Sequence, residues 1–140
     1  MPEREKVLQV VREWIAKAEN DLKTAAHTLK LGPGCPTDTV CFHAQQCAEK
    51  YVKAVLVLAG IDFPKTHDIE EIVALLPVGI KLSMTVEQQR RLTRYATVAR
   101  YPGWGEIPLV EARRAVALAR GVRREVRRRL PWEVQRSRKR

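Results

Sequence analysis

Residues 41–56 read Cys-Phe-His-Ala-Gln-Gln-Cys-Ala-Glu-Lys-Tyr-Val-Lys-Ala-Val-Leu, and this stretch is the most informative part of the sequence. At about 100° per residue of an α-helix, small and apolar side chains fall on one face: Ala44, Ala48, Tyr51, Val55 and Leu58. Polar side chains form a stripe about 80° wide on the opposite face: His43, Gln46, Lys50 and Lys53. The pattern predicts a helix that packs through one face and presents hydrogen-bonding and cationic groups on the other.

The same helical spacing recurs along the chain, whereas the alternation typical of strands is absent. Between residues 11 and 29, apolar residues step by three or four: Val11, Trp14, Ala18, Leu22, Ala25 and Leu29. This predicts a long first helix that ends near Gly32-Pro33-Gly34. The second helix is expected to begin at a Thr37 or Asp38 cap and to end at Gly60.

Three further helices are expected in the C-terminal half. A short one runs from His67-Asp68 to Leu76. A fourth begins with the capping box Thr85-Val86-Glu87-Gln88 and stops at Arg100-Tyr101-Pro102-Gly103. Pro108 suits the first turn of a fifth helix, whose apolar positions are Leu109, Ala112, Val116, Ala119, Val126 and Leu130. We therefore predict an all-α protein, an antiparallel up-and-down bundle of four main helices plus a short helix.

The length favours one domain over residues 1–140, with a core at about residues 7–130 and a frayed basic tail at 131–140. Of the formal charge of +10, most lies in residues 120–140, which hold ten Lys or Arg against Glu125 and Glu133. Such a segment favours weak, non-specific nucleic-acid contact by the basic C-terminus; a solvated helix end is an equal alternative. Arg outnumbers Lys 17 to 9 and Asn occurs once, a composition that weakly indicates a thermophile.

No stretch approaches the length of a membrane span, since the longest apolar run, residues 54–61, has eight residues. The N-terminus, Met-Pro-Glu-Arg-Glu-Lys, has no secretory apolar core, so a cytoplasmic protein is expected. Cys35, Cys41 and Cys47 lack metal-ligand spacing. We expect buried thiols in a reducing compartment, with no metal site and no cofactor.

Motifs for catalysis are missing, because no Gly-rich loop follows a strand and no serine lies in a nucleophile motif. Polar groups gather instead in three segments: the His43 stripe, Thr66-His67-Asp68 and Arg100-Tyr101-Pro102. Taken singly, each has a structural explanation: a surface histidine, a helix cap and a helix end. Glu49 is expected on an ordinary solvated helix face.

The combination of these segments is more informative than any one of them. Trp14, Ala18 and Asp21-Leu22 are followed by residues 41–54, by Pro64-Lys65-Thr66-His67-Asp68-Ile69 and by Arg100-Tyr101-Pro102. In this order they resemble the HEPN domain family (higher eukaryotes and prokaryotes nucleotide-binding) over about Val7 to Leu130. The resemblance implies a helical bundle, a homodimer and frequent pairing with a separately encoded minimal nucleotidyltransferase. Some members are metal-independent ribonucleases, often the toxin of a toxin–antitoxin pair; others bind nucleotides or partners without cutting.

The ribonucleases of this family share an Arg and a His separated by four to six residues. The chain lacks that spacing, because no Arg stands at the required distance before His27, His43 or His67, and no His follows Arg100. Metal-independent cleavage of RNA needs a base for the 2′-hydroxyl and a group that stabilises the phosphorane. We therefore expect no catalytic residue, with Arg100 and either His43 or His67 as the pair that a rearranged ribonuclease would use.

The leading hypothesis is a non-catalytic nucleotide-binding or partner-binding module that acts with a minimal nucleotidyltransferase. Its candidate site residues are His43, Gln46, Lys50, Lys53, His67, Arg100 and Tyr101. The two lysines and the arginine would contact the phosphates of ATP or GTP, the histidines and the glutamine would hydrogen-bond the base or ribose, and the tyrosine would stack. The alternatives are a metal-independent ribonuclease and a purely protein-interaction subunit, in which the polar stripe is part of an interface.

Overall fold

The computed structural model describes residues 2–135, which form helices and no strands. The four long helices are α1 (Pro2–Leu29), α2 (Thr37–Leu58), α4 (Val86–Ala96) and α5 (Leu109–Arg127). The shorter elements are α3 (Ile69–Val73), α6 (Trp132–Gln135) and the 3-10 turns η1 (Gly32–Gly34) and η2 (Val98–Arg100). The prediction of an all-α antiparallel bundle of four main helices with a short helix is confirmed.

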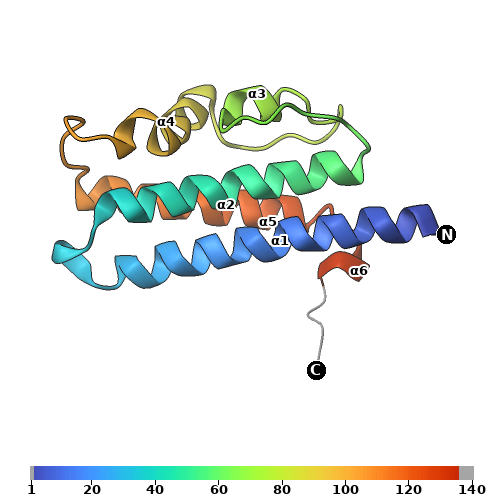
Figure 1. Ribbon diagram of the computed structural model, residues 1–140, viewed down its shortest axis with the longest axis horizontal. Coiled ribbons are helices and arrows are strands. Elements are labelled where there is room, and N and C mark those ends of the chain that lie inside the picture. Colours follow the sequence, from blue (N-terminus) through green and yellow to red (C-terminus); the bar gives the residue numbers. More distant parts are fainter. Residues whose placement is uncertain (1, 136–140) are drawn as a thin grey trace.

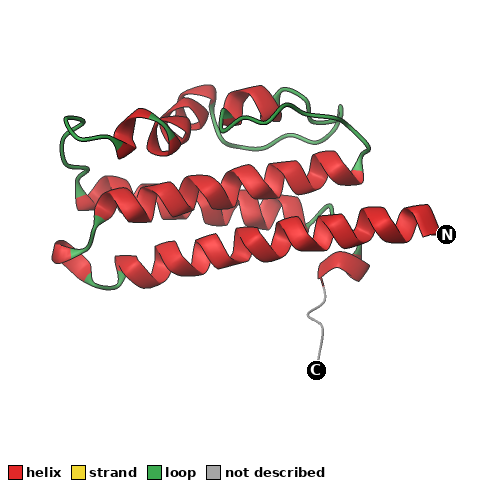
Figure 2. Cartoon of the chain, viewed as in Figure 1, coloured by secondary structure: helices red, strands yellow, loops and turns green. Residues whose placement is uncertain are grey.

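Helix α2 lies at the centre of the bundle (Figure 1). Helix α1 runs antiparallel along one side of α2, α5 packs behind it, and α3 and α4 cover a further side. Loops are confined to the helix ends and to the segments that flank α3 (Figure 2). Among residues 2–135, no helix combines the length and the hydropathy that crossing a membrane requires.

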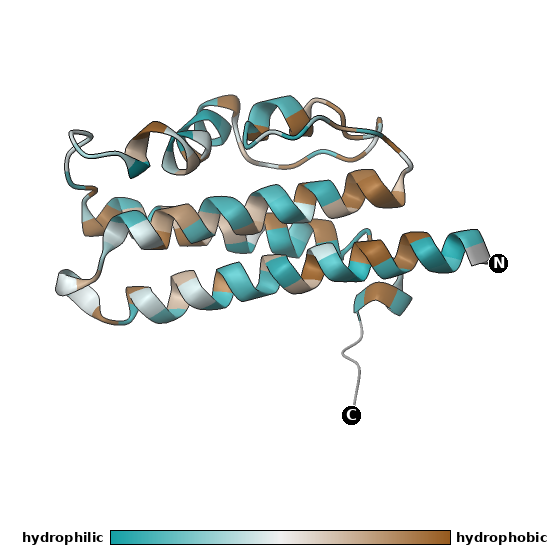
Figure 3. Cartoon of the chain, viewed as in Figure 1, coloured by the Kyte–Doolittle hydropathy of each residue, from teal (hydrophilic) through white to brown (hydrophobic). Residues whose placement is uncertain are grey.

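Helix α2 is buried well beyond the single face that the sequence predicted. Every residue from 44 to 56 except Lys50 is buried, although hydrophilic residues occupy the middle of the helix (Figure 3). The prediction that Glu49 lies on a solvated face is wrong, because it is 3 % exposed. Polar groups enclosed in this way need partners inside the protein. Among the described residues, no buried side-chain nitrogen or oxygen lacks one.

Several predicted helix ends are confirmed. The Thr85 hydroxyl and the Gln88 side chain form the expected capping box at α4. Asp68 caps α3 by accepting a hydrogen bond from the backbone of Glu71, although α3 is shorter than predicted and ends at Val73. Gly60 follows α2 with a φ of 73°, a conformation that favours glycine.

The predicted side-chain cap of α2 is wrong. The helix begins at Thr37 directly after Pro36, and no side chain caps it. The Thr37 hydroxyl instead donates to the carbonyl of Ile107 at 2.7 Å. This bond ties the start of α2 to the segment that leads into α5, so the two helix starts lie side by side.

The C-terminal segment also differs from the prediction. Residues 131–135 do not fray, because Trp132–Gln135 form α6 and Val134 is only 4 % exposed. Arg12 of α1 donates to a carbonyl of α6 at 3.4 Å, and Arg127 of α5 donates to another at 3.1 Å. Helix α6 is thus fastened to both α1 and α5. The remainder of the predicted tail, residues 136–140, lies outside the described part of the chain.

The three cysteines are buried and unpaired, as predicted. Burial raises the pKa of the Cys41 thiol to about 12. Burial, followed by the charge of Glu19, raises the pKa of the Cys47 thiol as well. Because the thiolate is the reactive form, both side chains act as small hydrophobic residues of the core.

Candidate functional site

Two buried carboxylates organise the polar residues of α2, and the first belongs to α1. Asp21 is 8 % exposed, and one of its carboxylate oxygens lies 2.7 Å from Nδ1 of His43. The other oxygen accepts a hydrogen bond from Nζ of Lys50 at 2.6 Å. Asp21 follows Ala18 by three residues and precedes Ala25 by four, which places it on the packed face of α1. The charge of Lys50 is therefore compensated within the protein.

The second carboxylate is that of Glu49 on α2. Its Oε2 accepts from Nζ of Lys53 at 2.8 Å, and its Oε1 lies 3.0 Å from Nδ1 of His67. The same Oε1 accepts from the amides of Gln45 and Gln46 at 2.9 and 3.4 Å. Gln45 also donates to the carbonyl of His67 at 3.1 Å, which holds the loop before α3 against α2. We refer to one set of residues as the polar seam: Asp21, His43, Gln45, Gln46, Glu49, Lys50, Lys53 and His67.

Lys53 is the most enclosed cation of the polar seam, with 8 % of its side chain exposed. Its Nζ also donates to the carbonyl of Thr66 at 3.0 Å. It lies 5.6 Å from the ring centroid of Trp14 and 5.5 Å from that of Phe63, within the range of a cation–π contact. A phosphate would reach this ammonium only by displacing Glu49 or the two rings.

Arg100 and Tyr101 lie at a separate cleft, between the η1 loop and the segment that leads into α5. The cleft has a volume of about 800 Å³ and is lined by residues 33–38, 99–103 and 105–109. Tyr101 is 70 % exposed. Arg100 is exposed, and among residues 2–135 it has no carboxylate partner. Its guanidinium carbon lies 4.5 Å from the ring centroid of Phe42.

Phe42 connects this loop cleft to the polar seam. The edge of its ring meets the ring of His43 with the two centroids 5.3 Å apart, while its face carries Arg100. His43 therefore borders both places. The structure groups the predicted site residues accordingly: His43, Gln46, Lys50, Lys53 and His67 lie in the seam, and Arg100 and Tyr101 lie at the cleft.

The fold and this arrangement can be compared with known proteins. A sequence model of the HEPN domain matches residues 11–129 of the chain. The chain belongs to the HEPN family. The resemblance drawn from the sequence is thereby confirmed.

Two crystal structures are similar to this HEPN chain over most of their length. TT1696 from Thermus thermophilus is 28 % identical, with a TM-score of 0.74 over 86 % of this chain and 98 % of that one. ST0689, an archaeal HEPN homologue, is 27 % identical, with a TM-score of 0.67 over 85 % of this chain and 96 % of that one.

A third relative is similar over a shorter segment. "Putative toxin MJ1304" from Methanocaldococcus jannaschii is 45 % identical over 56 residues, which are 40 % of this HEPN chain. The match spans 35 % of the length of that relative. The similarity to this relative therefore covers less than half of either protein.

Sequence reasoning missed the acidic half of the seam in this HEPN chain. Asp21 and Glu49 neutralise the two lysines, yet neither was among the candidate residues. Two signals could have found them. Asp21 shares the apolar stripe of Ala18, and Glu49 stands four residues before Lys53, a spacing that favours an ion pair on one helix.

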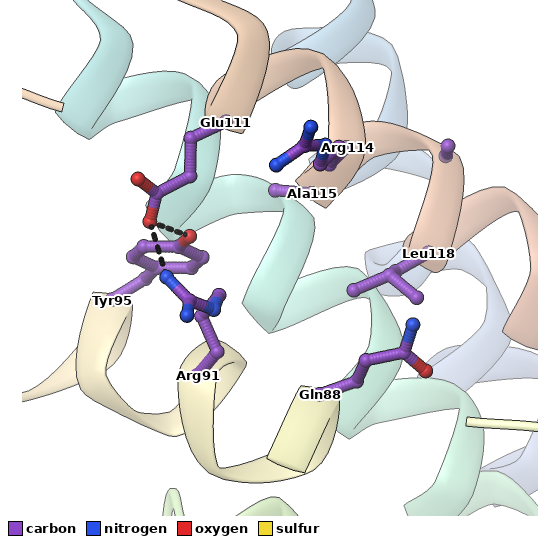
Figure 4. Close-up of a pocket in the computed structure, with 8 residues that line it drawn as sticks. Gln88, Arg91, Tyr95, Glu111, Arg114, Ala115 and Leu118 are labelled. Atoms are coloured by element: carbon purple, nitrogen blue, oxygen red, sulfur yellow. Dashed lines mark hydrogen bonds and ion pairs between the residues drawn. The ribbon is translucent and has the colours of Figure 1, made fainter. Parts of the chain in front are cut away.

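A further groove separates α4 from α5 (Figure 4). Its volume is about 460 Å³. At one end, Glu111 accepts hydrogen bonds from the Tyr95 hydroxyl at 2.5 Å and from Arg91 at 3.2 Å. Burial, together with the hydrogen bond to Glu111, raises the pKa of Tyr95, so the phenol stays protonated. Arg114 lines the α5 side of the groove and has no acidic partner among the described residues.

The arrangement offers binding groups and one group suited to proton transfer. Asp21 holds Nδ1 of His43 and leaves Nε2 without a protein partner among residues 2–135, which is the orientation of a histidine held by a carboxylate to act as a base. In the same part of the chain, no group of three or more His, Cys, Asp or Glu side chains is placed to hold a metal ion.

Proposed function

We propose that this chain is a non-catalytic HEPN module that binds a nucleotide at the loop cleft and acts with a minimal nucleotidyltransferase. The observation that carries the proposal is the state of the cations. Lys50 and Lys53 are paired with buried carboxylates, whereas Arg100 has no carboxylate partner within the described residues and stands at the cleft. A phosphate is attracted to an uncompensated cation far more than to one already neutralised.

The cleft has the size and the groups for such a ligand. Its volume of about 800 Å³ lies within the usual range of small-molecule sites. Arg100 would bind the phosphates, and the exposed ring of Tyr101 would stack on the base. The polar seam would then help to position the residues of the cleft, because Phe42 contacts both His43 of the seam and Arg100 of the cleft.

Calorimetric titration with ATP and GTP tests the binding part. A charge-assisted hydrogen bond contributes about 1.5–3 kcal/mol, so Arg100→Ala should weaken binding by roughly 10- to 150-fold. Tyr101→Ala should weaken it less, and Lys23→Ala, which removes an exposed cation from α1, should leave it unchanged. Absence of heat with the wild-type chain at millimolar nucleotide would contradict nucleotide binding.

The partner part of the proposal rests on family membership. The relative named as a toxin supports a toxin–antitoxin partner for this chain, and exposed aromatic and aliphatic side chains near the cleft, Val98, Tyr101 and Trp104, offer an apolar surface. Co-expression with a minimal nucleotidyltransferase should give a stable complex, and light scattering should give a homodimer for the chain alone. A complex that forms equally well without nucleotide and in Arg100→Ala would favour a pure interaction subunit.

Ribonuclease activity is the second candidate, and the Asp21–His43 contact favours it. In that reaction His43 Nε2 would take the proton of a 2′-hydroxyl, and the 2′-oxygen would attack the adjacent phosphorus. The 5′-oxygen would leave and take up a proton, which yields a 2′,3′-cyclic phosphate. Arg100 lies against the ring of Phe42, which in turn contacts His43, and it would stabilise the charged phosphorane.

Incubation of the pure protein with mixed RNA in EDTA distinguishes this candidate. Cleavage that disappears in both His43→Ala and Arg100→Ala would establish it, and Asp21→Asn should then lower the rate strongly because the imidazole would lose its orientation. RNA that stays intact with the wild-type chain would remove it.

A further inference from the structure

The outer face of α5 carries a row of arginines. At about 100° per residue, five of them fall within an arc of about 120° on the face opposite the buried positions of the helix: Arg113, Arg114, Arg120, Arg124 and Arg128. We call these residues the α5 arginine stripe. All five are exposed. At 1.5 Å per residue, the stripe extends for about 22 Å along the helix and its C-cap.

None of these arginines has an ion pair within the described residues. The acidic residues of α5 are engaged elsewhere, because Glu111 binds Tyr95 and Arg91, and Glu125 accepts from the backbone of Ser83 at 3.1 Å. Other arginines of the bundle are paired, such as Arg123 with Glu19. The stripe thus holds an uncompensated cluster of positive charge on one straight surface.

The residues between the arginines indicate which kind of partner fits. Ala117 and Gly121 occupy the middle of the stripe, and Val110 is the large apolar residue exposed at its end. Protein interfaces are centred on large apolar or aromatic anchors and are poor in charge at that centre. A face with small residues and arginines instead suits a chain of phosphates, which arginine binds through two parallel hydrogen bonds.

The groove between α4 and α5 adjoins the stripe. Arg114 belongs to both, and across the groove lie Arg91 and Gln88 (Figure 4). Ala115 and Leu118 give the groove an apolar lining, and its volume of about 460 Å³ is sufficient for a nucleotide. A base that turns out of a bound strand at Arg114 could pack in the groove against Ala115 and Leu118. The amide of Gln88 and the guanidinium of Arg91 line the same groove.

We propose that the α5 arginine stripe binds the phosphodiester backbone of a nucleic-acid strand and that the groove between α4 and α5 receives one of its bases. This surface is separate from the loop cleft at Arg100, and the proposal does not depend on nucleotide binding or cleavage there. The stripe shares Arg120, Arg124 and Arg128 with the basic segment of residues 120–140, and it extends that positive surface along α5 to Arg113 and Arg114, beside the groove.

Fluorescence anisotropy with the full chain tests the proposal. The probes are single-stranded RNA of about 20 nucleotides, an RNA duplex and a DNA duplex, titrated between about 50 and 200 mM salt. The variant Arg113→Gln/Arg120→Gln/Arg124→Gln is compared with Lys6→Gln/Lys17→Gln/Lys23→Gln, which removes the same charge from exposed positions of α1. Thermal melts monitor folding of both. Since the substitutions are at exposed positions, both variants should melt as the wild type does.

The expected result is binding that weakens with salt and depends on the stripe. Five contacts to a single strand predict a slope of log K against log salt near −3.5, and the stripe variant should reduce it to about −1.4. The stripe variant should bind at least tenfold more weakly at about 100 mM salt. The α1 variant should stay within about twofold of the wild type. The strand form that binds tightest identifies the ligand.

Several results would overturn the proposal. Equal losses in the stripe and α1 variants would mean that net charge alone attracts the probe. Binding of poly-glutamate without binding of any oligonucleotide would assign the surface to an acidic protein. Inorganic polyphosphate that binds as tightly as RNA would remove the base-binding role of the groove.

Discussion

The polar seam and the α5 arginine stripe are both rich in cations, but only in the seam are the charges compensated. Asp21 and Glu49 neutralise Lys50 and Lys53 inside the bundle, whereas the arginines of the stripe face water without ion pairs among the described residues. Burial explains the difference. A cation that loses water must gain a partner or destabilise the fold, and a cation in water has no such requirement.

The seam and the stripe are therefore expected to respond differently when their charges are removed. In the seam, the charges stabilise the contact of α2 with α1 and with the loop before α3, so their removal should affect folding first. On the α5 face, the charges stabilise little, and their removal should affect binding first.

Removal of Glu49 should have the largest effect on stability. Glu49→Ala leaves the ammonium of Lys53 buried without its partner, which costs about 3–5 kcal/mol of unfolding free energy. Urea denaturation measures it. The double variant Glu49→Leu/Lys53→Met should recover most of the loss, because it removes both buried charges. Arg120→Ala on the stripe should change stability by less than about 0.5 kcal/mol. Equal effects at Glu49 and Arg120 would remove the distinction.

Helix α6 is fastened to both α1 and α5, and its loss should have the second largest effect. Val134→Ala removes a side chain that is 4 % exposed, and full burial of a valine contributes about 1.5–3 kcal/mol, of which alanine retains a part. A chain that ends at residue 130 also loses the hydrogen bonds from Arg12 and Arg127 and should lose about 2–3 kcal/mol. Calorimetric melts measure both. A chain ending at residue 135 is the control, and an unchanged melt on truncation at 130 would contradict the docking of α6.

Helix α5 is also joined to α1 by an ion pair, between Arg123 and Glu19 of α1. Burial alone would raise the pKa of this carboxyl, but hydrogen bonds from Arg123 and Tyr51 lower it below its usual value. A lowered folded-state pKa gives stability that is present above the unfolded value, near 4.5, and is lost as pH falls through the folded value. Glu19→Gln should therefore cost about 1–2 kcal/mol at pH 7. This cost should shrink as the pH falls below 4.5 and the folded-state carboxyl becomes protonated. Urea midpoints measured from pH 7 downward test this, and a cost that does not change with pH would contradict it.

A small gain in stability is expected in the middle of the stripe, at Gly121. Gly121 is helical, and a Cβ added there would lie 3.8 Å from Nη2 of Arg124, an ordinary contact. Gly121→Ala should therefore stabilise the chain by roughly 0.5–1 kcal/mol through helix propensity. Thermal melting measures this gain. Destabilisation would show that the helix needs close approach at this point, which the open surface of the stripe does not suggest.

Much of the fold followed from local patterns. The spacing of Val11, Ala18 and Ala25 predicted α1, the capping box at Thr85 predicted α4, and Gly60 marked the end of α2. These features depend on neighbours within one turn, so a single sequence displays them. The expected side-chain cap at Thr37 was wrong because its hydroxyl donates to the carbonyl of Ile107, which is 70 residues away.

The candidate site followed less completely. The pattern of α2 correctly predicted that His43 and Lys50 lie on one side of the helix. It also predicted, wrongly, that Glu49 is exposed to solvent. A helix that packs against neighbours on several sides has no solvated face for most of its length. The spacing of its own apolar residues does not show how many helices will pack against it. The link from Arg100 through Phe42 to His43 joins residues nearly 60 positions apart, which only the packed bundle brings together.

Helices α1 to α5, their order and the family could be predicted from the sequence alone, because helix propensity, capping and apolar spacing act over short distances. Which charges form ion pairs inside the bundle and which remain unpaired on its surface depends on the tertiary structure. Ion pairing in a buried place depends on which helix faces meet, so Asp21 could find Lys50 only after α1 lay against α2. The arginines of the α5 arginine stripe stayed unpaired for the same reason, since no ion pair joins them to an acidic residue of the described chain.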